Sequence, residues 1–244
     1  MRERILVVGG PGSGKTWGWL KLAAYFKDSQ FYVIDSEIGA ERSLQEFPNL
    51  RNVHVYPVSE WKDYRDAQNE VAAKSTANDW IVVDMVDKAW SAVQRYFVDE
   101  IFSKEMGDYF LEARRKIKKD AKSLFGGHDS ALKGWTDWVV INKLYEDFML
   151  PIVYRYPANL YLATAGQPVS EEDDKEVRSL YGPLGLRPSG QKNLAYQPDT
   201  VLFFMHAADG YYMSTIKDRG GRKYLDKQKL YSFPIQYGAI AGWF

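Results

Sequence analysis

Short apolar runs along the chain alternate with longer stretches in which apolar residues recur at helical spacing. Five runs predict strands: Arg4–Val8, Phe31–Asp35, Val53–Val58, Asp79–Met85 and Asn159–Ala165. Their interiors are apolar on consecutive positions, as is typical of a parallel strand covered on both faces. Pro57 near the end of the third run indicates an edge strand or a strand end.

The stretches between these runs predict helices. One is expected from Gly14 to about Phe26, a second around Trp61 to Val71, and a third after Asp87, which is placed to cap it. Residues 103–122 are polar and helical, and Phe125–Ser130 interrupts the chain before a further amphipathic stretch.

A hairpin is predicted near the C-terminus. The apolar runs Asp199–His206 and Tyr211–Lys217 flank Asp209-Gly210, a strong turn signal. The order of elements predicts an α/β fold, with a mainly parallel central sheet flanked by helices and a C-terminal antiparallel hairpin. We expect residues 1–244 to form a single domain, with a helical insertion over 86–135 and a flexible loop over 166–198.

Composition narrows the classes of function. The chain has 244 residues, 45% hydrophobic and 26% charged, with formal net charge +0 and no cysteine. No apolar stretch is long enough to span a membrane, and the absence of cysteine fits a cytoplasmic protein. Zero net charge means that nucleic-acid binding would have to rest on local basic patches. The three histidines show no metal-ligand spacing.

The segment GGPGSGKT carries the strongest chemical signal. Gly9, Gly14, Lys15 and Thr16 fit the spacing G-x-x-x-x-G-K-[ST], between a predicted buried strand and a predicted helix. Backbone N–H groups of such a loop close around phosphates, the Lys reaches the β- and γ-phosphates, and the hydroxyl binds Mg²⁺. The predicted nucleotide-binding residues are Gly10, Pro11, Gly12, Ser13, Gly14, Lys15, Thr16 and Trp17.

Two further acids are expected beside this loop. Asp84 ends a buried strand and is predicted to hold the magnesium ion together with Thr16, with Asp35 as a competitor. Glu37 lies just past the end of Phe31–Asp35 and is predicted to orient the attacking water.

In the order of their elements and the types of their motifs, residues 4–225 resemble the RecA-like branch of P-loop ATPases. The chain is most similar to compact phage-encoded RecA-like and AAA-type ATPases linked to single-strand annealing and recombination, which would work in a host cytoplasm. In RecA-like proteins the second strand ends in Phe-Ile-Asp-x-Glu, with the Glu activating water. YVIDSE matches this pattern and implies that role for Glu37.

The resemblance also implies further site residues and partners. Gln167 stands where the family has a sensor of the γ-phosphate, at the start of a DNA-binding loop. In this chain the segment RPSGQKNLAYQPD resembles the tail of that loop. Lys217 and Arg219 match the cation pair that reaches a neighbouring subunit's nucleotide, which implies a homo-oligomer. The family's first DNA loop cannot be placed in 86–135, and no filament-type N-terminal helix is present, so rings, dimers and partner-induced assembly stay open.

Two cation clusters and the long loop bear on single-stranded DNA binding. One cluster comprises Arg114, Arg115, Lys116, Lys118, Lys119 and Lys122, and the other Lys217, Arg219, Arg222, Lys223, Lys227 and Lys229. Tyr181, beside Arg178 and Arg187, is a candidate for base stacking. Charge runs commonly decorate a solvated helix face, and the acidic run Glu171–Asp174 opposes a simple DNA cradle.

Three functions compete at this point. The first is an ATP- and Mg²⁺-dependent ATPase coupled to single-stranded DNA in recombination, replication or repair. The second is a small-molecule nucleotide kinase, with Gly166–Pro198 as a lid over the phosphates. The third is a nucleotide-driven assembly protein, for instance in DNA packaging.

Overall fold

The structure is a computed structural model that describes residues 2–120, 134–221 and 225–243. Lys122 and the predicted break at Phe125–Ser130 lie outside the described residues, as do Arg222 and Lys223. The side chains of Arg114, Lys116, Lys118 and Lys119 are likewise outside the description.

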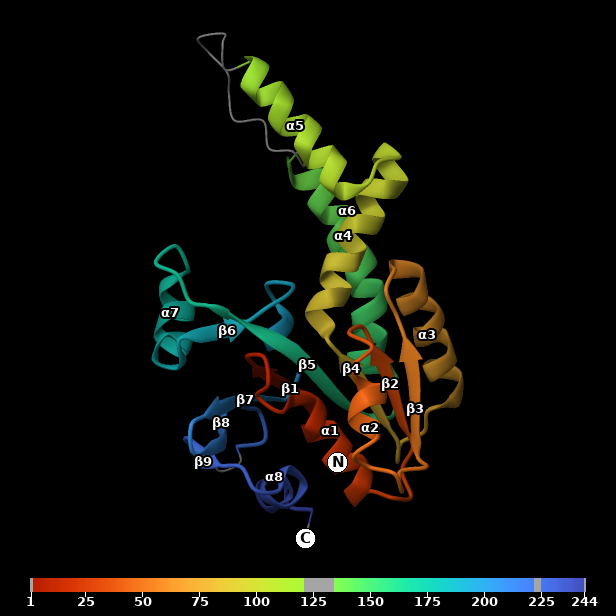
Figure 1. Cartoon of the computed structure of the whole chain (residues 1–244), viewed down its shortest axis with the longest axis vertical. Helices are drawn as coiled ribbons and strands as arrows, with labels where there is room; N and C mark the ends of the chain where they lie inside the picture. The colour runs from red at the N-terminus through yellow and green to blue at the C-terminus, as the bar shows by residue number, and fades with distance from the viewer. Residues whose placement is uncertain (1, 121–133, 222–224, 244) are drawn as a thin grey trace.

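A twisted sheet forms the centre of the protein (Figure 1), with the strand order β3-β2-β4-β5-β1-β7-β8-β9. The first six strands in this order are parallel, whereas β8 and β9 are antiparallel to their neighbours. The strands are β1 (Arg4–Gly9), β2 (Phe31–Asp35), β3 (Val53–Pro57), β4 (Trp80–Asp84), β5 (Asn159–Pro168), β6 (Leu186–Pro188), β7 (Thr200–Ala207), β8 (Gly210–Asp218) and β9 (Gln228–Lys229).

Helices cover both faces of this sheet, which explains the unbroken apolar runs of its strands. They are α1 (Lys15–Tyr25), α2 (Ala40–Leu44), α3 (Trp61–Lys74), α4 (Val86–Phe102), α5 (Met106–Asp120), α6 (Gly134–Leu150), the π-helix η1 (Pro151–Arg155), α7 (Lys175–Tyr181), the 3₁₀ turns η2 (Gly182–Leu184) and η3 (Leu194–Tyr196), and α8 (Phe233–Ala241).

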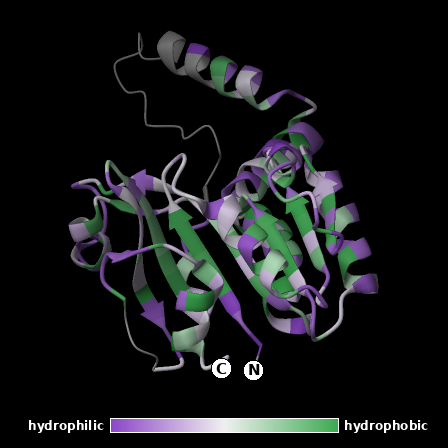
Figure 2. Ribbon diagram, turned by 60° about the horizontal axis from the view of Figure 1, so that its bottom comes forward, coloured by the Kyte–Doolittle hydropathy of each residue, from purple (hydrophilic) through white to green (hydrophobic). Residues whose placement is uncertain are grey.

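Two hydrophobic layers enclose the sheet. Leu6 and Val8 of β1 pack in the layer formed with α3, α4 and α6, while Ile5 and Val7 pack in the layer formed with α1 and α8. Figure 2 shows the strands as hydrophobic segments inside the molecule. Successive side chains of a strand point to opposite faces, so a strand buried on both sides must be apolar at consecutive positions.

The predicted mainly parallel sheet and the C-terminal hairpin are confirmed. β3 lies at the edge of the sheet, as Pro57 indicated, and β7 and β8 form the predicted hairpin. β5 runs three residues beyond the predicted end at Ala165, because its extension pairs with β6 outside the main sheet. No helix in the described part of the chain is long and apolar enough to cross a membrane.

Two segments depart from the rest of the fold. In 86–135, α4 contributes Ala89, Val93 and Phe97 to the core, while α5 projects from the body (Figure 1). The segment 166–198, expected to be a flexible loop, contains α7, β6 and two 3₁₀ turns. Tyr181 is 7% exposed there, so the prediction that its ring stacks on a DNA base is wrong.

Candidate nucleotide-binding site

The phosphate loop joins β1 to α1 at the edge of the sheet where the parallel strands end. Gly14, directly before the helix, has φ 95°, a left-handed conformation that favours glycine. A Cβ at Gly9 would collide with the Ser13 side chain and the Phe204 carbonyl. The glycines therefore allow the loop to close tightly at the positive end of α1.

Lys15 is held inside this loop. Its Nζ donates to the carbonyl oxygens of Gly9 at 2.9 Å and Gly10 at 3.0 Å. Burial lowers the pKa of Lys15, against the opposing effect of the nearby acids Asp84, Glu37 and Asp87. The Ser13 Oγ is buried without a hydrogen-bond partner. A partly desolvated cation beside an unpaired polar atom fits a site built for a phosphate group.

Thr16 and Asp84 meet at the floor of the site. Thr16 Oγ1 donates to Asp84 Oδ2 at 2.9 Å, and Trp19 Nε1 donates to the same oxygen at 2.9 Å. Burial raises the pKa of Asp84, with the two hydrogen bonds acting in the opposite direction. A hydroxyl and a carboxylate in contact beside a phosphate loop fit Mg²⁺, which takes few protein ligands in addition to phosphate oxygens and water.

We expect Asp84→Asn to abolish Mg²⁺-dependent turnover while maintaining or raising the melting temperature. Because the folded-state pKa of Asp84 is raised, its favourable contribution is present below the unfolded value of 3.8 and is lost as pH rises through the folded value. The substitution removes this penalty while keeping an acceptor for Thr16 and Trp19. The stability difference between variant and wild type, followed by thermal melts from pH 4 to 8, should grow with pH. A variant that is less stable at every pH would contradict the burial argument.

The loop after β2 brings Glu37 to the same site. Asp35, buried and paired in register with Asp84, accepts from the backbone N–H of Glu37 at 3.1 Å and of Ala40 at 2.9 Å. The loop turns sharply there, with Ile38 at φ 53°. Asp35 therefore shapes the loop, and the Glu37 carboxylate stays half exposed, 4.0 Å from the Lys88 ammonium.

Asp87 does not cap α4, contrary to the sequence prediction. The helix begins at Val86, and the Asp87 carboxylate accepts from Thr164 Oγ1 and the Ala165 N–H, each at 3.3 Å. The single hydroxyl proton of Thr164 is shared between this carboxylate and the Ser189 carbonyl, which is the nearer acceptor at 2.9 Å. The Asp87–Thr164–Ser189 contact thus joins the start of α4 to β5 and to the residues that precede η3. The feature of the sequence that points to this contact is the position of Asp87 in DMVD, three residues after Asp84 at the end of β4.

Gln167 lies on the extension of β5. Ala165 pairs with Gly9 of the phosphate loop, so Gln167 is two residues further along and pairs with Arg187 of β6. Its amide lies against the Pro188 carbonyl and the Arg187 guanidinium. Arg187 also forms an ion pair with Asp173 at 3.0 Å. The structure thus places Gln167 on a ribbon next to the site, outside the wall of the cavity that contains Lys15.

Lys217 and Arg219 lie at the opposite end of the sheet from the phosphate loop. Lys217 pairs with Val201 near the start of β7, whereas Tyr211, at the other end of β8, approaches Gly14. Lys217 Nζ donates to the carbonyls of Ala195, Tyr196 and Pro198, and Arg219 donates to that of Tyr196. Burial and the cations Arg219 and Arg4 lower the pKa of Lys217 to about 8.

A cavity of about 630 Å³ opens over the phosphate loop. It is lined by Pro11–Gly18, Lys21, Glu37, Ser43 and Met85, and by the distant residues Tyr211, Leu230, Tyr231, Ser232 and Phe233. All predicted residues from Pro11 to Trp17 line it, together with Glu37. The sequence did not predict that Tyr211 and Tyr231 line the cavity or that Trp19 bonds to Asp84, because no local motif connects these residues with the loop.

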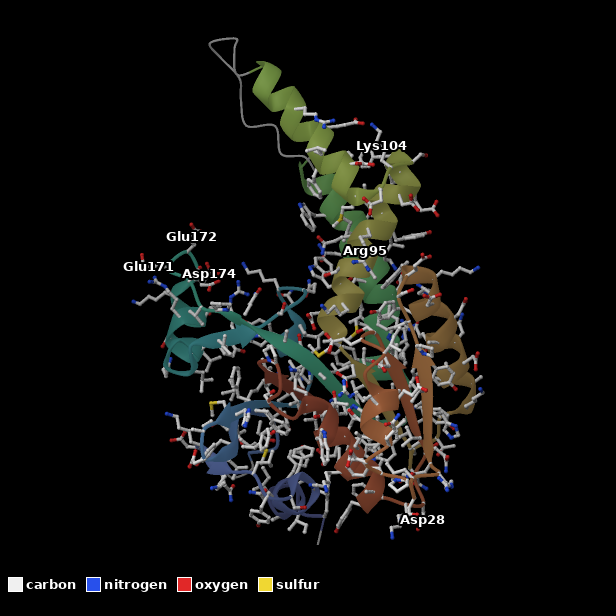
Figure 3. The ribbon with its side chains drawn as sticks, viewed as in Figure 1. Asp28, Arg95, Lys104, Glu171, Glu172 and Asp174 are labelled. Carbon is white, nitrogen blue, oxygen red and sulfur yellow. The ribbon has the colours of Figure 1, made fainter. Side chains whose placement is uncertain are left out.

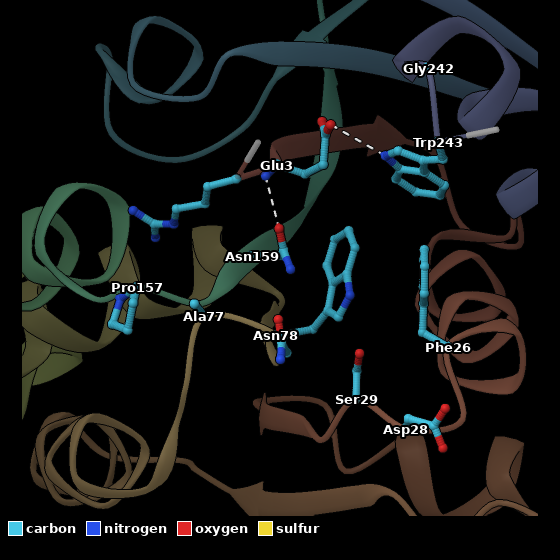
Figure 4. Close-up of a pocket in the computed structure, with 12 residues that line it drawn as sticks. Glu3, Phe26, Asp28, Ser29, Ala77, Asn78, Pro157, Asn159, Gly242 and Trp243 are labelled. Carbon is cyan, nitrogen blue, oxygen red and sulfur yellow. Dashed lines mark hydrogen bonds between the residues drawn. The ribbon is translucent and has the colours of Figure 1, made fainter.

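A larger cavity of about 700 Å³ lies at the other end of the strands (Figure 4). Its main polar groups already have protein partners: Glu3 accepts from Tyr237 and Trp243, and Asn159 accepts from the Glu3 N–H. Arg2 donates to carbonyls of residues 152, 153 and 158. This cavity is separate from the phosphate loop. Its paired groups join the residues before β1 to the C-terminal segment and to residues 152–159.

Together, the parallel sheet, the loop at its C-terminal edge and the Thr16–Asp84 pair define a P-loop nucleotide-binding protein with a RecA-like fold. The chain belongs to the AAA domain family, whose pattern matches residues 1–139.

Comparison with solved structures supports the same fold. A structure titled "Crystal structure of the RadB recombinase" is similar at 12% sequence identity, with a TM-score of 0.52, covering 92% of this chain and 85% of that chain. Comparison with curated proteins finds no match.

Proposed function

We propose that the protein is an Mg²⁺-dependent ATP hydrolase whose turnover is coupled to single-stranded DNA in recombination, replication or repair. The observation that carries the proposal is the meeting of Lys15, Thr16 and Glu37 around one cavity, with the buried Asp84 carboxylate bonded to Thr16 beneath it. These groups come from three different strand ends, and a phosphate-binding turn without catalytic purpose would not require the two acids.

In this reaction Glu37 acts as the base. Its exposed carboxylate takes a proton from water as the water oxygen bonds to the γ-phosphorus and the bond to the bridging oxygen breaks, which gives ADP and phosphate. Lys15 leaves the carbonyls of Gly9 and Gly10 and balances charge on the β- and γ-phosphates. Thr16 and Asp84 would hold Mg²⁺, which would supply neutralisation of phosphate charge.

Lys217 and Arg219 act on the nucleotide of another copy of the chain in this proposal. Lys217 lies six positions along β8 from Tyr211, which approaches Gly14. At about 3.3 Å per residue this corresponds to roughly 20 Å, too far for either cation to reach its own phosphate loop. In a homo-oligomer, Lys217 and Arg219 of one copy would lie against the nucleotide cavity of its neighbour and act there in trans.

The DNA part of the proposal rests on the fold and on the ribbon at Gln167. The structurally similar protein is a recombinase by its title. Gln167 and the Asp87–Thr164–Ser189 contact tie residues near the phosphates to segment 166–198. Figure 3 shows Glu171, Glu172 and Asp174 at the tip beside α7, so we place DNA away from that acidic tip.

Steady-state phosphate release with and without a single-stranded oligonucleotide tests this function. We expect DNA to increase turnover. We also expect DNA and ATP to bind with positive coupling, so that each raises the affinity for the other by the same factor. Turnover that is unaffected by DNA, together with no DNA binding, would overturn the DNA part. Transfer of the γ-phosphate to a nucleoside monophosphate would instead establish the kinase alternative.

A further inference from the structure

The cavity over the phosphate loop has two chemically different halves. The first contains the loop, Lys15 and Glu37, and is suited to phosphate. The second is walled by aromatic and aliphatic side chains. Trp17 comes from the start of α1, whereas Tyr211, Leu230, Tyr231 and Phe233 come from segments distant in sequence. Ligand sites commonly combine a few placed polar groups with such an apolar wall.

Three rings of the aromatic wall are exposed to solvent. Tyr231 is 74% exposed, Trp17 44% and Tyr211 42%. Large apolar side chains gathered in the open around one cavity indicate a ligand that covers them.

Hydrogen bonds hold the wall in place. The backbone N–H groups of Tyr231 and Ser232 donate to the buried Gln236 Oε1 at 2.9 and 3.0 Å, and Gln236 Nε2 donates to the Lys229 carbonyl at 2.8 Å. The Leu230 N–H donates to the Tyr211 carbonyl at 2.7 Å. The backbone that carries Tyr231 is therefore ordered before any ligand arrives, which lowers the entropy lost on binding.

Tyr211 and Trp17 connect the wall to the phosphate loop. The Tyr211 ring stacks on His206 with centroids 4.4 Å apart, and its Cδ1 lies 3.8 Å from the position that a Cβ on Gly14 would take. Trp17 directly follows Thr16, with the Lys21 ammonium 5.6 Å from its ring centroid. A nucleotide whose phosphates occupy the loop would therefore have its base directed to these rings.

We propose that Trp17, Tyr211 and Tyr231 form the nucleobase subsite, and that this subsite selects purine over pyrimidine nucleotides by stacking area. The inference rests on the proposed function, since it assumes that the loop holds a triphosphate. Outside the phosphate loop, the polar side chains that line the cavity are Lys21, Glu37, Ser43, Ser232 and the two tyrosine hydroxyls. With Glu37 assigned to the attacking water, none of the others offers both a donor and an acceptor in the planar arrangement that distinguishes the edge of adenine from that of guanine. ATP and GTP therefore bind alike, while the single ring of CTP covers less of the wall.

Calorimetric binding of ATP, GTP, CTP and inorganic tripolyphosphate, each with Mg²⁺, to wild type and Tyr231→Ala tests the subsite. We expect Tyr231→Ala to lower the affinity for ATP and GTP by about tenfold, which is within the range for stacking of one base on an aromatic side chain. The affinity for CTP should fall by less. Tripolyphosphate, which has no base, should bind both proteins equally. Tyr25→Ala, which removes another exposed tyrosine ring from the far end of α1, is the control and should bind ATP like wild type.

An unchanged ratio of ATP to CTP affinity in Tyr231→Ala would overturn the subsite, as would an equal loss of tripolyphosphate binding. A wild-type preference of tenfold or more for ATP over GTP would overturn selection by stacking area. Failure of wild type to bind tripolyphosphate at all would instead contradict the proposed function, and the subsite would fall with it.

Discussion

Replacing Glu37 with Gln should lower ATP turnover by about 10²- to 10⁴-fold, the usual contribution of a general base, while ATP affinity stays close to that of wild type. The Glu37 side chain is half exposed and lies 4.0 Å from Lys88, so its loss removes no buried contact. Gln keeps the size of the side chain but cannot accept the proton. Steady-state phosphate release and equilibrium binding of ATP measure the two effects separately.

Glu41→Gln is the matched control for this substitution. Glu41 is an exposed acid in α2, four residues further along the same connection, and does not line the cavity. It should retain wild-type turnover. Full activity in Glu37→Gln, or an equal loss in Glu41→Gln, would contradict the assignment of Glu37 as the base.

The Lys217→Ala/Arg219→Ala double variant should lower turnover by about 10³-fold or more, as expected when cations that stabilise the transferring phosphate are removed. Because these side chains lie at the other end of the sheet from their own phosphate loop, the loss should be repairable in trans. Mixed with inactive Glu37→Gln, the variant should recover measurable turnover, since the Glu37→Gln copies supply the cations and the variant supplies the intact site.

The mixing experiment also separates catalysis from folding. Lys217 and Arg219 donate to carbonyls between residues 195 and 198, so their removal also loosens that segment. A variant inactive because it is misfolded would not be rescued. Lys27→Ala/Lys62→Ala, which removes two exposed cations elsewhere, should leave turnover unchanged. No recovery on mixing, with both variants folded, would exclude action between subunits.

The phosphate loop, the strands and the acids at their ends could be predicted from sequence because each depends on local order. Glycine spacing determines the closure of the loop, and consecutive apolar residues identify strands buried on both faces. Parallel strands end at one edge of a sheet, so the sequence predicts Asp84 and Glu37 beside Lys15. The same reasoning led to the pairing of Thr16 with Asp84.

Only the tertiary structure decided how distant segments complete this edge. Asp87 looked like a helix cap, but the approach of β5 gave its carboxylate partners in Thr164 and Ala165. Tyr181 lay in a segment that looked flexible, and packing buried it. Tyr211 and Tyr231 reach the cavity because the hairpin and the chain before α8 fold back along β7. Local patterns specify which conformation a segment adopts, whereas contacts between segments far apart in sequence depend on the packing of the whole sheet.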